Sequence, residues 1–382
     1  MQDLALYIHW PFCLAKCPYC DFNSHVRERI DQTRFAASLR RELAWEAARI
    51  GRRRLVSIFF GGGTPSLMDP QTVADLIADA KRLFIPADDL EITLEANPTS
   101  VEATRLAAFR DAGINRVSLG VQSLNAEDLR RLGRQHSVEQ AIAALEVARS
   151  LFTRVSFDLI YARPGQSLAA WRQELRQALG FGGEHLSLYQ LTIEPGTAYE
   201  ALHRRGEIVL PEDDLAAALY DATGEEAARF GLLPYEVSNY AKPGQESRHN
   251  LVYWRYSDYA GIGPGAHGRL LLAGQLHATT RHRAPEPWAE LVETHGHGTR
   301  GEEIVSPVDQ AREMLLMGLR LSEGVRADRF LARTGLPLED RLDRDTLRAA
   351  EEAQYVTWDG AVLRATGEGR KRLDALLTAL VC

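Results

Sequence analysis

Three of the four cysteines in this chain, Cys13, Cys17 and Cys20, fall within eight residues of one another. Their Cys-x3-Cys-x2-Cys spacing lets three thiolates converge on one small object. Zinc usually takes four ligands, so a zinc site would need His9 or His25 to complete it. An iron–sulfur cubane is the alternative, and three thiolates would leave one of its irons open to a small molecule. The spacing alone favours the iron–sulfur cluster over zinc.

Other groups that could bind a ligand follow short apolar runs of the sequence. The stretch Gly61-Gly62-Gly63-Thr64 comes directly after such a run, and glycine lets a backbone approach a ligand closely. Glu95 closes another run and could accept hydrogen bonds from hydroxyl or amino groups. Asp158 lies inside a third run, where a carboxylate needs a partner or a function. These residues are candidates for one binding site.

Six apolar runs alternate with segments of helical periodicity, which predicts an α/β fold with parallel strands. The expected strands are 4–8, 55–60, 90–95, 116–121, 155–161 and 185–191. The expected helices are 34–49, 70–84, 102–112, a broken stretch over 126–150, and 168–179. A full or partial barrel and a doubly wound sheet both fit this order. In either fold the ligand groups at the carboxyl ends of the strands meet in one pocket.

The rest of the chain divides into two parts. Proline and glycine interrupt residues 201–305, so we expect a loop-rich extension with one clear helix at 212–230. Residues 306–382 predict helices at 308–321, 327–334 and 343–352, a hairpin over 355–364, and a last helix at 368–380. This pattern resembles a small winged-helix domain. Cys382, at its end, has no expected role.

Composition places the chain among soluble globular proteins, with 45% apolar and 25% charged residues. A net charge of −7 gives no overall basic surface, so no nucleic-acid binding is expected. No apolar run approaches the roughly 20 residues that span a membrane. The first residues also lack the basic region of a signal peptide. Together with the few cysteines, these features predict a cytoplasmic protein.

The stretch from Tyr7 to Asn23, YIHWPFCLAKCPYCDFN, resembles the signature of the radical S-adenosylmethionine (SAM) superfamily. Within that superfamily it closely resembles the branch that contains oxygen-independent coproporphyrinogen III dehydrogenases (HemN) and the HemW haem chaperones. The similarity extends over nearly the whole chain. It implies a partial (β/α)6 barrel over residues 1–200 and a HemN-type C-terminal domain over 306–382. It also implies a 4Fe-4S cluster on the three cysteines, with SAM bound to the fourth iron.

The same resemblance assigns further residues to the cofactor site. Gly62, Gly63 and Thr64 would receive the methionine amino group of SAM. Gln122 and Arg134 would also contact SAM, since the arginine fork suits a carboxylate. The remaining expected SAM residues are Tyr7, Tyr19, Glu95 and Asp158.

Two departures separate this chain from the dehydrogenases of that branch. Their motif continues to a fourth cysteine, where this chain has Phe22, and they carry an N-terminal extension that is absent before Cys13. The sequence RHNLVYW, residues 248–254, instead matches an HNxxYW motif of the haem chaperones. The resemblance therefore implies haem binding through an exposed His249, with His267 as a second, weaker candidate.

The expected function is that of a haem chaperone that binds haem as cargo on a cluster- and SAM-binding scaffold. The expected partners are haem-acceptor proteins, respiratory enzymes among them, with transient membrane contact. The alternative is an anaerobic radical-SAM enzyme that oxidises coproporphyrinogen III or a related tetrapyrrole. Whether SAM is cleaved productively is left open, so the chain is not assigned as an enzyme. A zinc-stabilised binding protein is the third alternative, and it predicts a colourless preparation.

Overall fold

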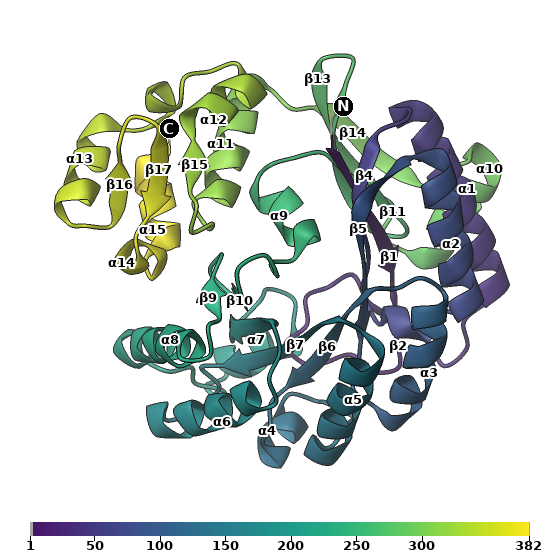
Figure 1. Ribbon diagram of the computed structural model, residues 1–382, viewed down its shortest axis with the longest axis horizontal. Helices are drawn as coiled ribbons and strands as arrows, with labels where there is room; N and C mark the ends of the chain where they lie inside the picture. The colour runs from purple at the N-terminus through teal and green to yellow at the C-terminus, as the bar shows by residue number, and fades with distance from the viewer. Residues whose placement is uncertain (1–2, 382) are drawn as a thin grey trace.

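A twelve-stranded sheet is the framework of the computed structural model, which describes residues 3–381. Six neighbouring strands run parallel. They are β1 (Asp3–Trp10), β4 (Arg54–Gly62), β5 (Ile85–Ala96), β6 (Arg116–Gln122), β7 (Arg154–Tyr161) and β8 (His185–Gln190). Each apolar run of the sequence thus forms a strand, and the predicted partial barrel is confirmed (Figure 1). Cys382 lies outside the described residues.

Helices link these strands and cover the outer side of the curved sheet (Figure 1). They are α1 (Gln32–Ile50), the 3-10 turn η1 (Pro65–Leu67), α2 (Pro70–Leu83), α3 (Ser100–Asp111), α4 (Ala126–Arg131), α5 (Val138–Leu151) and α6 (Leu168–Gly180). Local capping fixes their starts. The Asp31 carboxylate accepts a hydrogen bond from the backbone N–H of Arg34, and Ser137 with Gln140 forms a capping box before α5. Their apolar stripes pack with the strands into one core.

The extension is more regular than its sequence predicts. It contains α7 (Ala198–Arg204), α8 (Asp213–Ala228), β9 (Leu233–Pro234), β10 (Asn239–Ala241), α9 (Arg248–Trp254), β11 (Tyr259–Ile262), β12 (His267–Leu272), β13 (Gln275–Arg281), α10 (Pro285–His295) and β14 (Thr299–Ile304). Strand β11 pairs parallel with β1, and β12 to β14 continue the same sheet antiparallel. The expectation of a loop-rich segment is therefore wrong.

Close backbone approach explains the glycines that suggested loops. A Cβ on Gly261 would lie 2.0 Å from the carbonyl oxygen of His267, and one on Gly263 would lie 2.3 Å from the carbonyl oxygen of His9. Any other residue would push these strands apart. Glycine here permits sheet packing rather than a flexible connection.

The C-terminal part has a three-stranded sheet in the order β15-β17-β16 and a second hydrophobic core, which also includes Tyr256 and, from β13, Leu276 and Ala278. Its elements are α11 (Pro307–Gly318), β15 (Val325–Arg326), α12 (Ala327–Thr334), the 3-10 turn η2 (Leu338–Arg341), α13 (Arg344–Glu352), β16 (Val356–Trp358), β17 (Val362–Ala365), α14 (Gly367–Arg370) and α15 (Leu373–Leu380). The predicted hairpin is β16–β17, and the last predicted helix is split in two. This part faces the inner side of the barrel sheet, with α9 between them (Figure 1).

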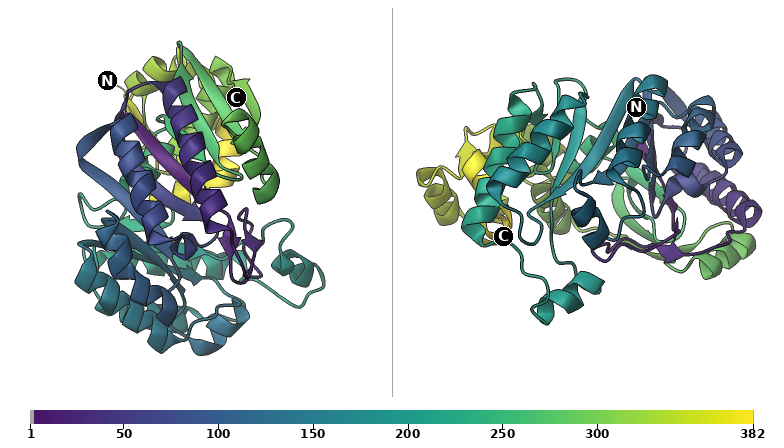
Figure 2. Two further views of the ribbon diagram at one scale, coloured as in Figure 1. Left: turned by 90° about the vertical axis from the view of Figure 1, so that its right-hand side faces the viewer. Right: turned by 90° about the horizontal axis from the view of Figure 1, so that it is seen from below.

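Helix α7, drawn in teal, stands out from the rest of the molecule (Figure 2). It still contacts the cysteine segment, because the backbone N–H of Tyr199 donates to the carbonyl of Pro18 at 2.9 Å. Among residues 3–381, the helices are all too short or too polar to cross a bilayer.

Candidate functional site

The three cysteines lie in a loop that leaves the carboxyl end of β1. Two short strands close this loop, β2 (Phe12–Cys13) and β3 (His25–Val26), which pair in parallel. Inside it, the backbone N–H of Cys20 donates to the carbonyl of Cys17 at 3.2 Å. All three thiols are partly buried and line one cavity of about 750 Å³, which we call the cofactor cavity.

The chemistry of this loop fits an iron–sulfur cluster. Burial raises the pKa of the Cys13 and Cys20 thiols, so a bound metal group is needed to hold them as thiolates at neutral pH. The Thr64 hydroxyl donates to the Cys13 sulfur at 3.4 Å, and Arg134 Nη1 donates to the Cys17 sulfur at 3.3 Å. Hydrogen bonds to cluster sulfurs tune the reduction potential. In the described chain, no three His, Cys, Asp or Glu side chains meet around a point suited to a single metal ion.

The glycine segment at the end of β4 is joined directly to the cysteine loop. The backbone N–H of Gly63 donates to the carbonyl of Trp10 at 2.7 Å, and that of Thr64 to the carbonyl of Phe12 at 2.8 Å. Gly62 has a φ of 111°, and a Cβ there would lie 2.5 Å from the His9 ring. A Cβ on Gly63 would lie 2.7 Å from the Phe12 carbonyl oxygen. Gly62 and Gly63 must therefore lack a side chain for this segment to pack against the cysteine loop.

Two acids reach the cofactor cavity from the strands β5 and β7. Burial, and secondly repulsion from Asp158, raises the pKa of Glu95 to about 8. Burial also raises the pKa of Asp158 to about 6, although the Ser118 hydroxyl donates to its Oδ1 at 3.2 Å. The backbone N–H of Gly62 donates to Glu95 Oε2 at 3.3 Å. Partly buried carboxylates with so few donors, on the wall of a cavity, suit a ligand that brings ammonium and hydroxyl groups.

Arg134, in the loop between α4 and α5, brings positive charge to the cavity, which Lys16 and Arg320 also line. Its Nη2 donates to Asn97 Oδ1 at 2.5 Å and to the carbonyl of Gly120 at 2.9 Å. Gly120 permits this approach, because a Cβ there would lie 2.9 Å from the Gln122 amide nitrogen and 3.3 Å from Arg134 Nη2. The Nε of Arg134 is buried and has no partner in the described chain. This donor is available to a carboxylate.

The cofactor cavity thus brings together the three cysteines and eight of the nine residues expected to bind SAM. They are Cys13, Cys17, Tyr19, Cys20, Gly62, Gly63, Thr64, Glu95, Gln122, Arg134 and Asp158. Tyr7 and His249 do not line it. Sequence reasoning missed Asn97, whose amide also donates to the Thr64 hydroxyl at 3.2 Å. Its place just after the third predicted strand was the available signal.

With this geometry established, similarity to known proteins identifies the family. Residues 7–178 match the Radical SAM superfamily, and residues 305–371 match the HemN C-terminal domain. Over 99% of its length, the chain is 39% identical to the haem chaperone HemW of Escherichia coli strain K12, of which it covers 98%. The chain belongs to the HemW family of radical SAM proteins.

Two other relatives of this HemW-family chain agree with that placement. The mitochondrial radical S-adenosyl methionine domain-containing protein 1 of Bos taurus is 40% identical over all of this chain and 88% of its own length. The solved structure of coproporphyrinogen III oxidase (HemN) from Escherichia coli has the same fold, with a TM-score of 0.82. The two sequences are 22% identical, and the match covers 99% of this chain and 89% of the HemN chain.

In this HemW-family chain, His249 is buried rather than exposed. It lies on α9, its Nδ1 is 2.9 Å from the Ser57 hydroxyl, and its Nε2 is 2.7 Å from the Tyr253 hydroxyl. Its ring stacks on Phe59 at 4.8 Å between centroids, and burial lowers its pKa to about 3. The expectation of an exposed imidazole is wrong, because the motif forms a helix that packs on β4. Both ring nitrogens are used to fix α9.

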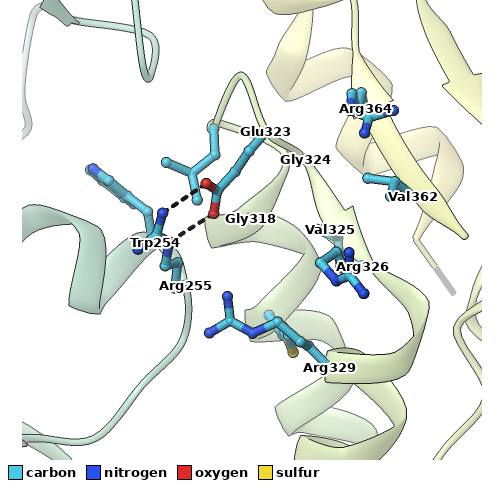
Figure 3. A pocket seen from close by; sticks show the side chains of 12 residues that line it. Trp254, Arg255, Gly318, Glu323, Gly324, Val325, Arg326, Arg329, Val362 and Arg364 are labelled. Atoms are coloured by element: carbon cyan, nitrogen blue, oxygen red, sulfur yellow. Dashed lines mark hydrogen bonds and ion pairs between the residues drawn. The ribbon is translucent and has the colours of Figure 1, made fainter. Parts of the chain in front are cut away.

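Helix α9 also connects the barrel to the C-terminal part. Arg255, which follows the helix, forms two hydrogen bonds of 2.7 Å with the Glu323 carboxylate (Figure 3). This ion pair borders a cavity of about 420 Å³, into which Arg329 extends. Trp254 lines this cavity and the cofactor cavity as well. The HNxxYW segment therefore positions Trp254 between the barrel and the C-terminal part.

Proposed function

We propose that this protein is a haem chaperone that binds haem and transfers it to acceptor proteins. The observation that carries the proposal is the similarity to HemW of Escherichia coli, named a haem chaperone, at 39% identity over almost the full length of both chains. Phe22 agrees with it, because the tetrapyrrole dehydrogenases that the sequence resembles have a cysteine at this place.

We further propose that the cofactor cavity holds a 4Fe-4S cluster on Cys13, Cys17 and Cys20, with SAM beside it. Three thiols on one loop leave one iron for the ligand, and a reduced cluster of this kind can pass one electron to bound SAM. Hydrogen bonds from Thr64 and Arg134 to the sulfurs support this assignment.

The other lining residues suit the polar groups of SAM. The unpartnered Nε of Arg134 would bind the carboxylate of SAM. Glu95 and Asp158 would accept hydrogen bonds from its ammonium group and ribose hydroxyls. Gln122, Tyr19 and the segment from Gly62 to Thr64 would complete the walls.

The chaperone requires acceptors, and we propose respiratory haem proteins, reached by transient membrane contact. A cytoplasmic location fits three partly buried, unpaired thiols, because thiols persist in a reducing compartment. Haem transfer to an acceptor is therefore measured separately from haem binding.

The test is an anaerobic titration of the cluster-reconstituted protein with haem, followed by visible absorption. Saturable binding near one haem per chain, then transfer to an apo-acceptor, is the expected result. If no haem binds saturably and SAM is cleaved only when coproporphyrinogen III is present, the chain is a tetrapyrrole oxidase and the proposal is wrong. A readout with SAM alone controls for uncoupled cleavage.

A further inference from the structure

A second cavity of about 690 Å³ lies beside the cofactor cavity. We call it the side cavity, and its walls include Tyr253, Trp254, Tyr259, His267, Arg283 and Arg300. Its size is within the range of cavities that hold cofactor-sized ligands. Phe22, Gly62, Glu95 and Trp254 line both cavities, so a ligand in one would lie next to a ligand in the other.

One wall of the side cavity is aromatic. Tyr253 on α9 and Tyr259 on β11 meet edge to face, with 4.5 Å between ring centroids and 79° between planes. Trp254 and Tyr7 also line this cavity, and the Tyr7 hydroxyl is 2.9 Å from His9 Nδ1. Tyr7 thus belongs to this cavity and not to the cofactor cavity. Aromatic rings of this kind pack well against a flat apolar macrocycle.

His267, the first residue of β12, lines the side cavity and is exposed. Unlike His9 and His249, whose ring nitrogens are hydrogen-bonded, its ring has no hydrogen-bond partner in the described chain. Partial burial and the charges of Arg269 and Arg283 lower its pKa, so the ring is neutral at physiological pH. A neutral imidazole with an unused lone pair can ligate iron.

Two arginines of the side cavity have unused donors. The Arg300 guanidinium has no hydrogen bond or ion pair among residues 3–381, and that of Arg283 has one bond, of 3.5 Å, to Asn23 Oδ1. Arg281 differs, because its guanidinium is buried and paired with Glu46. The two available forks therefore suit carboxylates that a ligand brings.

We propose that the side cavity binds haem, with His267 as the axial iron ligand, the aromatic wall on the porphyrin face, and Arg283 and Arg300 on the propionates. This inference rests on the proposed function and gives it a site. It assigns His249 a positioning role, which is to hold α9 so that Tyr253 and Trp254 form the wall.

The test compares haem titrations of the cluster-reconstituted wild type with those of His267→Ala. His295→Ala is the matched control, because His295 is another histidine without a hydrogen-bond partner and lies outside the cavity. We expect His267→Ala to shift the Soret band and weaken binding about tenfold or more, with the wild-type spectrum restored by free imidazole. SAM binding, measured in each variant, reports that the fold is retained.

A second arm tests the propionate contacts. The double variant Arg283→Gln, Arg300→Gln should bind haem at least about tenfold more weakly, whereas both proteins should bind haem dimethyl ester equally. A wild-type Soret band and affinity in His267→Ala would overturn the inference and leave the chaperone function standing. A loss of the wild-type Soret band in His249→Ala, but not in His267→Ala, would also overturn the inference and leave the chaperone function standing. Failure of the wild type to bind haem would instead refute the proposed function.

Discussion

Replacing Glu95 by glutamine should make the cluster-free protein progressively more stable, relative to the wild type, as the pH rises from 6 to 8. Glu95 is held among apolar strand residues, and burial raises its pKa to about 8 from the ordinary value of 4.5. In the unfolded chain its carboxyl returns to the ordinary value. Glutamine keeps an oxygen that can accept the hydrogen bond from the Gly62 N–H but has no proton to lose.

The sign follows from proton binding. Below pH 4.5 the carboxyl is protonated in both states, and its contribution to stability is complete. As the pH rises, the unfolded chain loses this proton first, so the contribution of Glu95 to the free energy of unfolding falls until the folded carboxyl ionises near pH 8. The difference between the two pKa values corresponds to about 5 kcal/mol in all. About 2 kcal/mol of this fall lies between pH 6 and 8.

The assay is anaerobic urea unfolding at pH 6, 7 and 8. The free energy of unfolding of the wild type, relative to that of Glu95→Gln, should fall by about 2 kcal/mol over this range. Buried histidines such as His9 and His249, whose pKa values are lowered, raise stability with pH equally in both proteins. Asp158, with a pKa raised to about 6, titrates mainly below the range and remains in both proteins. Glu303→Gln, at an exposed position, is the control and should keep the wild-type profile. A difference between the two proteins that stays the same from pH 6 to 8 would refute the reasoning.

Three further predictions concern the cofactor cavity. Gly63→Ala should place a Cβ against the Phe12 carbonyl, cost about 1–3 kcal/mol, and lower the iron bound per chain after reconstitution; unchanged iron content would contradict this. Thr64→Val removes the hydroxyl that donates to the Cys13 sulfur, so redox titration should give a more negative cluster potential, and an unchanged potential would count against the contact. Arg134→Lys keeps the charge but loses the fork, so calorimetry should show SAM affinity reduced about tenfold, with Arg131→Lys as the exposed control. Equal SAM affinity in both lysine variants would show that Arg134 does not bind the carboxylate.

Much of the barrel could be predicted from the sequence because its signals are local. Strand β4 is an apolar run of the right length, and α5 starts at a capping box, so each is specified by residues next to one another. The cysteine loop and the glycine segment are local as well. They come together because parallel strands end at the same edge of the sheet.

Residues 233–304 show where such signals fail. Gly261 and Gly263 lie in a glycine-rich stretch that is typical of a loop. In the structure they allow β11 and its neighbours to approach more closely than any side chain would permit. The short strands β11 to β14 obtain their stability from pairing with β1 and with each other, and local propensity does not record those partners.

By itself, the sequence determined the parallel α/β scaffold, the three-cysteine loop and most of the cofactor cavity, because short segments encode each of them. Only the tertiary structure decided which histidine is accessible. His249 is held between Ser57 and Tyr253, whereas His267 opens into a cavity built from β1, α9, β11, β12 and α11. Burial depends on contacts between residues far apart in the chain. A sequence motif that contains a histidine therefore does not determine whether water or a ligand can reach that histidine.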